Sequence, residues 1–136
     1  MYLHGKDIPP DDQKALKLTS LSAKQGFAPA QVSLGSHYSI GFFVPQSHQT
    51  ALKWYSLAEK QGWALGQFGL GLAYRRGEGV AQDNVYARMW LNIVSLQGYE
   101  EAEFWRDNTA QKMPPSQIEK AQDRAQECIK KNYQDC

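Results

Sequence analysis

Four residues recur almost unchanged at a fixed interval: KQGF at 24–27, KQGW at 60–63 and LQGY at 96–99. Each copy begins 36 residues after the one before, and in each a glycine is followed by an aromatic residue. A fixed interval of this size is typical of proteins built from stacked helical hairpins. The spacing therefore predicts a repeat architecture.

Many other positions align when the chain is stacked at the same interval. The aligned residues are aromatic, glycine, small or apolar, and they comprise Tyr2, Tyr38 and Tyr74; Gly5, Gly41 and Gly77; Ile8, Val44 and Val80; Ala15, Ala51 and Ala87; Leu18, Trp54 and Trp90; and Leu21, Leu57 and Ile93. Agreement at so many positions indicates successive copies of one unit.

The aligned positions have physical roles in a helical hairpin. Asp11, Ser47 and Asp83 carry side-chain oxygens that accept from free N–H groups, so we expect them to be helix N-caps. The glycines of the quoted stretches are expected to end helices in a left-handed conformation, with the aromatic residue that follows filling the junction between units. Gly35 and Gly71 fall inside expected helices, where glycine is tolerated if another helix approaches closely.

These signals predict an all-α chain in which no stretch alternates convincingly enough for a strand. A chain of 136 residues is large enough for one domain and too small for two. The expected helices span 12–25, 29–40, 48–61, 65–76, 84–97, 101–112 and 115–132.

Composition narrows the classes of partner. The apolar share is 42%, the charged share is 21%, and the formal net charge is +1. Nucleic acid or an acidic membrane surface usually selects a basic face, so we expect neither as a partner. No apolar run approaches the ~20 residues that cross a bilayer. The opening MYLHGKDIPP lacks a basic and then apolar region, so we expect no signal peptide.

The stretch LGLAYRRGEGVAQDNVYARMWLNIVSLQGY at 70–99 resembles the repeat unit of the Sel-one-like repeat (SLR) family, relatives of the tetratricopeptide repeats. The resemblance covers roughly residues 1–112. The middle unit departs from the pattern with Phe43 where the next unit has Gly79. Arg106 and Asp107 replace the Leu-Gly pair of the earlier units, which we attribute to a capping role with a polar outer face.

The resemblance implies an α/α solenoid of stacked antiparallel helix pairs, wound as a right-handed superhelix with a C-terminal capping helix. Within a single domain, 1–136, it implies a partial repeat 1–26, repeats 27–62 and 63–98, and a degenerate last helix and cap at 99–136. Family members are adaptors and scaffolds, often in bacteria. We therefore expect a noncatalytic module that binds a protein or peptide on its concave face.

The first helix of each unit is expected to line that face. The candidate partner-binding residues are Gln31, His37, Gln67 and Arg75. Trp105 and the pair Phe42–Phe43 fit the repeat less well. Each is either an exposed hot spot for a partner or packing for the cap and a turn.

Catalytic motifs are not evident. His4, His37 and His48 are far apart in sequence, with no recognisable nucleophile or metal-binding motif beside them. We therefore predict no catalytic residue, no metal and no cofactor. The alternative is a bacterial envelope or secreted enzyme or cell-wall-binding protein, hydrolase or penicillin-binding-like, which some cysteine-rich relatives resemble.

Cys128 and Cys136 are the two cysteines. On one continuous helix their Cα atoms would be ~12 Å apart, whereas a disulfide requires ~7 Å or less. Pairing therefore needs the helix to end near Asn132. The Cys-x7-Cys spacing resembles that of cysteine-rich secreted SLR proteins, which implies a disulfide and a periplasmic or secreted location. The alternative is two reduced thiols in a cytoplasmic tail.

We expect the apolar surface to be covered at the C-terminal end of the solenoid and exposed at the N-terminal end. The segment 115–132 is an amphipathic helix that we expect to cap the solenoid, with one face made of Ile118, Ala121, Ala125, Cys128 and Ile129. At the other end, Leu16, Leu18 and Leu21 are expected to be exposed by the partial first unit. We predict that this end is covered in a homodimer or by preceding chain.

Overall fold

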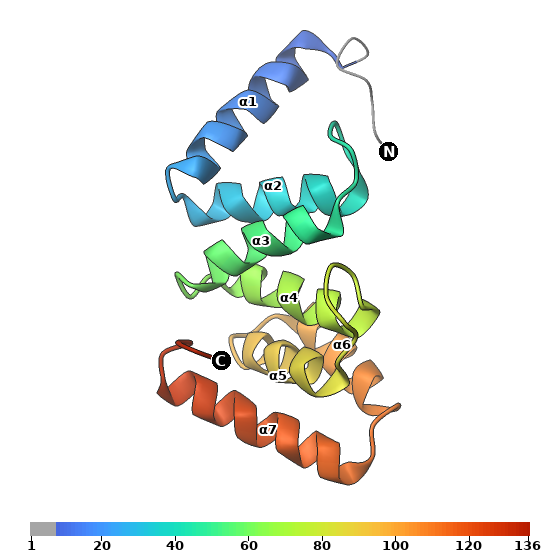
Figure 1. Ribbon diagram of the computed structural model, residues 1–136. Coiled ribbons are helices and arrows are strands. Elements are labelled where there is room, and N and C mark those ends of the chain that lie inside the picture. The colour runs from blue at the N-terminus through green and yellow to red at the C-terminus, as the bar shows by residue number, and fades with distance from the viewer. Residues whose placement is uncertain (1–7) are drawn as a thin grey trace.

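The computed structural model describes residues 8–136, which form α-helices and no strand (Figure 1). The helices are α1 (Pro10–Lys24), α2 (Ala28–Ile40), α3 (His48–Glu59), α4 (Ala64–Arg76), α5 (Asn84–Ser95), α6 (Glu100–Ala110) and α7 (Pro115–Lys130). The all-α prediction is confirmed, and the helices stack in chain order from α1 to α5. Tyr2, His4 and Gly5 lie outside the described residues.

Two of the three predicted N-caps are present. The side chain of Ser47 accepts from the Thr50 N–H at 3.2 Å, and that of Asp83 accepts from the Tyr86 N–H at 3.0 Å. The prediction for Asp11 is wrong. Pro10 supplies a backbone already suited to the first helical position, so α1 begins before Asp11 and places it within the first turn.

The turn between α2 and α3 keeps the repeat geometry despite its different sequence. Gly41 and Gly77 both end their helices in the left-handed region, at φ 71° and 69°. Phe43 adopts φ 65°, close to the 81° of Gly79 at the equivalent position. A non-glycine residue rarely adopts this conformation, so the unit retains its shape at a local conformational cost.

The glycines inside helices mark close approaches, as expected. A Cβ on Gly35 would lie 2.7 Å from the Tyr55 ring, and one on Gly71 would lie 3.0 Å from Cγ of Leu91. Gly66 is more strictly required, because its Cβ would lie 2.9 Å from backbone atoms of α3, which cannot move aside as a side chain can. These contacts fix the separation between neighbouring helices.

The aromatic residues after the quoted Gln-Gly pairs do not fill the junctions between units. Phe27, Trp63 and Tyr99 are 61%, 41% and 43% exposed. Each precedes a helix in an extended backbone conformation, and the small residue three positions later is buried instead, as Ala30 is at 8% exposed and Ala102 at 0%. That expectation is therefore wrong.

The larger core cluster joins α4, α5 and α7. It contains Leu70, Met89, Trp90, Ile93, Ala125 and Cys128. The helix α7 packs on α5 through Ala121, Ala125 and Cys128, as expected for a cap, whereas Ile129 is 39% exposed. The prediction that Ile129 lies on the packed face of α7 is therefore wrong. None of the helices within 8–136 has the length and apolar character needed to cross a membrane.

The chain reverses direction after α7. Asn132 and Tyr133 have left-handed φ angles of 56° and 64°. The segment that follows folds back toward α5 (Figure 1), and a disulfide joins Cys128 to Cys136, whose Cα atoms are 5.4 Å apart. The helix thus ends where the pairing of these cysteines requires.

Candidate functional site

A groove runs between the first helices of the two complete units. It has a volume of about 350 Å³, within the range of ligand-binding pockets. Its lining comes from α2 and α4 with one side chain from α3, and comprises Val32, Ser36, Ser39, Ile40, Tyr55, Leu65, Phe68, Gly69, Leu72 and Arg76. We refer to this set as the α2–α4 groove.

Apolar side chains in the groove are open to solvent. Ile40 is 62% exposed and Leu65 is 43% exposed. Phe104 of α6, 36 residues after Phe68, is also apolar and is 61% exposed. Exposed apolar residues gathered along a groove are typical of a site for another molecule.

Two arginines lie over an indole beside this groove. The guanidinium carbon of Arg75 is 4.5 Å from the centre of the Trp105 ring, and that of Arg76 is 5.7 Å from it. Arg75 also donates to the Asn108 side-chain oxygen. Arg76 lines the groove and forms an ion pair with Glu78 at 3.7 Å. The groove is therefore apolar along its length and positively charged near Trp105.

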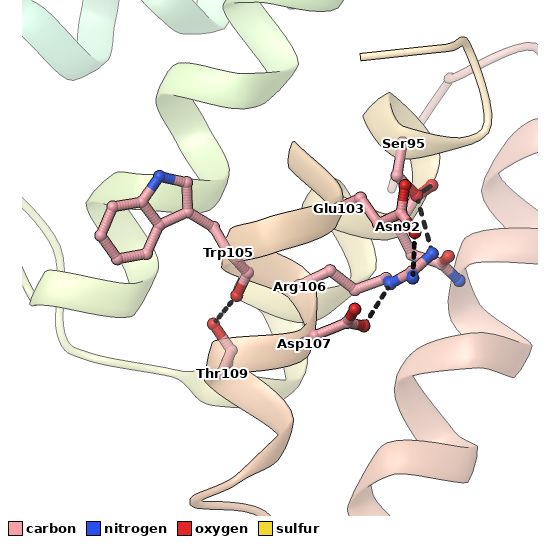
Figure 2. A network of polar contacts seen from close by, with 7 residues as sticks. All are labelled: Asn92, Ser95, Glu103, Trp105, Arg106, Asp107 and Thr109. Carbon is pink, nitrogen blue, oxygen red and sulfur yellow. Dashed lines mark hydrogen bonds and ion pairs between the residues drawn. The ribbon is translucent and has the colours of Figure 1, made fainter. Parts of the chain in front are cut away.

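The orientation of α6 places Trp105 beside α4. Figure 2 shows Trp105 and Arg106 pointing in opposite directions from this helix. Arg106 donates to Oγ of Ser95 on α5 at 3.1 Å and to Oδ1 of Asp107 at 3.0 Å. Arg106 occupies the position of the buried Leu34 and Leu70, so polar bonds to α5 replace apolar packing in this last unit.

Gln31 and Gln67 do not face a partner, and their prediction as partner-binding residues is wrong. They are 4% and 0% exposed. Oε1 of Gln31 accepts from Gln61 at 3.2 Å, and Oε1 of Gln67 accepts from Gln97 at 2.9 Å. Buried amides need such partners. The same bond recurs in both units, so these glutamines connect each first helix to the next Gln-Gly turn.

The side chain of His37 contacts the turn after α2. One ring nitrogen, Nδ1, lies 2.9 Å from the carbonyl oxygen of Phe42, and its ring stacks on that of Phe42 with centres 5.8 Å apart. Phe42 and Phe43 are themselves in ring contact at 4.0 Å. Of the five candidate residues, the structure brings Arg75 and Trp105 together, buries the two glutamines, and places His37 near the end of α2, outside the groove lining.

A polar cluster outside the groove lining contains a histidine and a carboxylate. Nε2 of His48 lies 3.1 Å from Glu78, and Nδ1 is buried without a hydrogen-bond partner among residues 8–136. Neither ring nitrogen thus bonds a serine or cysteine in the described part of the chain. Over the same residues, no group of three or more His, Cys, Asp and Glu side chains could hold a metal ion.

The apolar residues of the groove were not among the partner-binding residues predicted from the sequence. Val32, Phe68 and Phe104 recur at the 36-residue interval. Val32 precedes the buried Leu34 by two residues, and Phe68 precedes Leu70 by two, so each lies on the opposite side of its helix. An apolar residue that recurs on the side away from the core was the signal for this surface.

Comparison with known proteins places these features in a family. Three consecutive segments, 1–27, 28–63 and 64–99, match the Sel1 repeat. No curated protein is significantly similar to the chain.

Two of the similar solved structures are described by their fold or repeat. One is c5321, a protective antigen present in uropathogenic Escherichia coli strains and displaying an SLR fold, with a TM-score of 0.82 and 30% identity over 88% of this chain. The other is a Sel1 repeat protein from Oxalobacter formigenes, with a TM-score of 0.66 and 32% identity over 71% of this chain. The present chain spans 26% of the length of c5321 and 73% of that of the Oxalobacter protein.

Proposed function

The chain belongs to the Sel1 repeat family, and from this premise we propose that it is an interaction module that binds a peptide segment of a partner protein in the α2–α4 groove. The observation that carries the proposal is the exposure of Ile40 and Leu65 along a groove of about 350 Å³. Burial of such side chains under a partner is favourable in proportion to the apolar area removed from water.

The groove favours a peptide with apolar anchors and an acidic residue. Leu65, Phe68 and Leu72 offer apolar contacts one helical turn apart on α4. Arg76 at the same groove has a side chain that is 45% exposed. A carboxylate of the peptide would replace part of the hydration of the Arg76 guanidinium, and also the long ion pair between Arg76 and Glu78.

Selection from a displayed peptide library tests this proposal. We expect selected peptides to combine apolar and acidic residues, and their affinity to fall about ten-fold or more in Leu65→Lys. Leu96→Lys, directly after α5, is the matched control, because Leu96 is 64% exposed and lies outside the groove. Equal binding of the selected peptides by both variants would rule out the groove.

We also propose that α1 contacts a second copy of the chain or preceding chain. Leu18 and Leu21 are 56% and 47% exposed, which supports this proposal. Light scattering over a range of concentrations tests association between copies. A monomer at every concentration, with Leu18→Lys no more soluble than the unchanged protein, would contradict it.

An oxidising compartment is the location that we propose. The disulfide between Cys128 and Cys136 supports it, since such bonds persist in periplasmic and secreted proteins and are rare in the cytosol. Thiol labelling with a maleimide-linked polymer, applied to fractions of the native host, tests it. Unlabelled protein outside the cytoplasm is expected. Protein labelled at both cysteines in the cytosolic fraction would contradict it.

A further inference from the structure

A second recess, separate from the α2–α4 groove, lies beneath the C-terminal tail. Its volume is about 360 Å³, and it shares no lining residue with that groove. Its principal residues are Glu59 of α3, Tyr74 of α4, Tyr86 and Trp90 of α5, and Tyr133 of the tail. We refer to it as the tail recess.

The recess contains polar atoms that the described residues do not satisfy. Glu59 is 9% exposed, and its Oε1 has no hydrogen-bond partner. Trp90 is 3% exposed, and its indole N–H likewise has no acceptor. Buried polar groups in proteins are normally paired. The unpaired Glu59 oxygen is an acceptor, so it points to a missing ligand that donates hydrogen bonds.

The walls of the recess are aromatic. The rings of Tyr74 and Tyr86 stack with their centres 4.8 Å apart. The Tyr133 ring lies over the α3–α4 turn, where a Cβ on Gly62 would be 3.5 Å from it. Aromatic faces attract cations, because the faces of the rings carry partial negative charge.

The tail is held in place over the recess. The disulfide fixes Cys136 to α7, and the hydroxyl of Tyr86 donates to the Cys136 carbonyl oxygen. Lys60 and Asp135 also line the recess and carry opposite charges. Burial of Glu59 outweighs the effect of the Lys60 charge on its pKa, and Oε1 of Glu59 has no hydrogen-bond partner among residues 8–136.

We propose that the tail recess binds a small organic cation, a primary ammonium or guanidinium, whose N–H groups donate to Glu59 and whose carbon atoms contact the tyrosine and tryptophan rings. Burial raises the pKa of Glu59 to about 7, because the cost of removing the carboxylate from water, without a hydrogen-bonded cation as partner, outweighs the nearby charge of Lys60. A bound cation supplies that partner. A metal ion is a poorer fit, because no group of three or more His, Cys, Asp and Glu side chains within residues 8–136 is arranged to hold one.

Titration with n-butylammonium chloride tests the proposal, with 1-butanol as the neutral analogue and sodium chloride to match ionic strength. At pH 8 we expect saturable one-site binding of n-butylammonium, seen as shifts of the Trp90 indole N–H signal, and no saturation with 1-butanol. Glu59→Gln is expected to weaken binding about ten-fold or more. Glu119→Gln, at an exposed position of α7, is the matched control.

Two results would overturn the proposal: no saturable response to n-butylammonium, or equal affinity in Glu59→Gln and the unchanged protein. A second variant, Tyr133→Ala, changes the tail and leaves the helices intact. Its affinity is expected to fall, and an undiminished affinity would also overturn the proposal. Leu65→Lys in the groove is expected to leave n-butylammonium binding unchanged, which keeps the result independent of peptide binding.

Discussion

Nε2 of Gln97 donates a 2.9 Å hydrogen bond to Oε1 of Gln67, a side chain with no exposed surface. The equivalent pair 36 residues earlier is Gln61 and Gln31 at 3.2 Å. This recurring bond explains why glutamine precedes glycine in the repeated turn. The amide connects the turn at the end of one hairpin to the first helix of that hairpin, and thereby sets how the two helices pack.

The buried member of the pair is predicted to matter most for stability. Gln67→Ala should lower the free energy of unfolding by about 2 kcal/mol, because it removes both a buried hydrogen bond and packed volume. Gln97→Ala should cost less, since Gln97 is exposed. Urea unfolding measures both, with the exposed Gln122→Ala as control. A loss below about 0.5 kcal/mol in Gln67→Ala would contradict a structural role for this pair.

The repeat interval predicted the helices and turns because capping and turn chemistry are local. Ser47 and Asp83 cap their helices as expected. The expectation for Asp11 failed where a competing local signal, Pro10 at the first helical position, set the helix start.

The candidate site was harder to predict, because an interval does not say which way a side chain points. Gln31 and Gln67 align in sequence just as Val32 and Phe68 do, yet the first pair is buried and the second lines the groove. Two identical polar residues at one repeat position are the mark of an internal contact. The environment of Glu59 depends on a tail more than 70 residues away in sequence, roughly twice the repeat interval, and no local pattern encodes it.

Gly66 tests the close packing of α3 against α4. In an open helix, replacing glycine with alanine is favourable by about 1 kcal/mol. At Gly66 the added Cβ would lie 2.9 Å from the Glu59 nitrogen and the Tyr55 oxygen. We expect Gly66→Ala to be net destabilising by about 1–3 kcal/mol in thermal or urea unfolding. Ser33→Ala, at an exposed position of α2, is the control. Stabilisation of Gly66→Ala would show that the two helices are not held this closely.

The raised pKa of Glu59 predicts how the free energy of unfolding depends on pH. Burial raises its pKa from 4.5 to about 7 in the folded protein. The folded state therefore holds the proton more tightly than the unfolded chain between these values. The stability that this proton provides is complete below pH 4.5 and is lost as pH rises through 7, by up to about 3 kcal/mol.

Glu59→Gln isolates this contribution. The variant should resemble the unchanged protein at pH 5 and exceed its free energy of unfolding at pH 8. The variant keeps the other ionisable residues that line the recess, which are Lys60, Tyr74, Tyr86, Tyr133 and Asp135. A difference between the two proteins that does not change from pH 5 to pH 8 would contradict the raised pKa.

The disulfide is predicted to stabilise the cap. Cys136→Ser should lower the free energy of unfolding by about 2–3 kcal/mol, because the short loop it closes is then unrestrained in the unfolded chain. It should also weaken n-butylammonium binding, since Tyr133 is no longer held over the recess. Dithiothreitol should lower the stability of the unchanged protein to that of the variant and leave the variant unaffected. An equal effect of dithiothreitol on both would contradict the role assigned to the bond.

Arg76 is predicted to contribute its positive charge to peptide binding in the groove. Arg76→Glu should weaken a selected acidic peptide about ten-fold or more. The same peptide with its carboxylate changed to a lysine side chain should regain affinity for this variant. Fluorescence anisotropy measures all four combinations. Independent, additive effects of the two changes would mean that the peptide's acidic residue does not meet Arg76.

Peptide binding in the α2–α4 groove is tested most directly by adding a library-selected peptide to isotopically labelled protein and mapping the amide chemical-shift changes. The account predicts that the largest changes follow the α2–α4 groove, at Val32, Ser36, Leu65, Phe68 and Leu72. Changes concentrated on α1 or α7, with the groove amides unmoved, would contradict it.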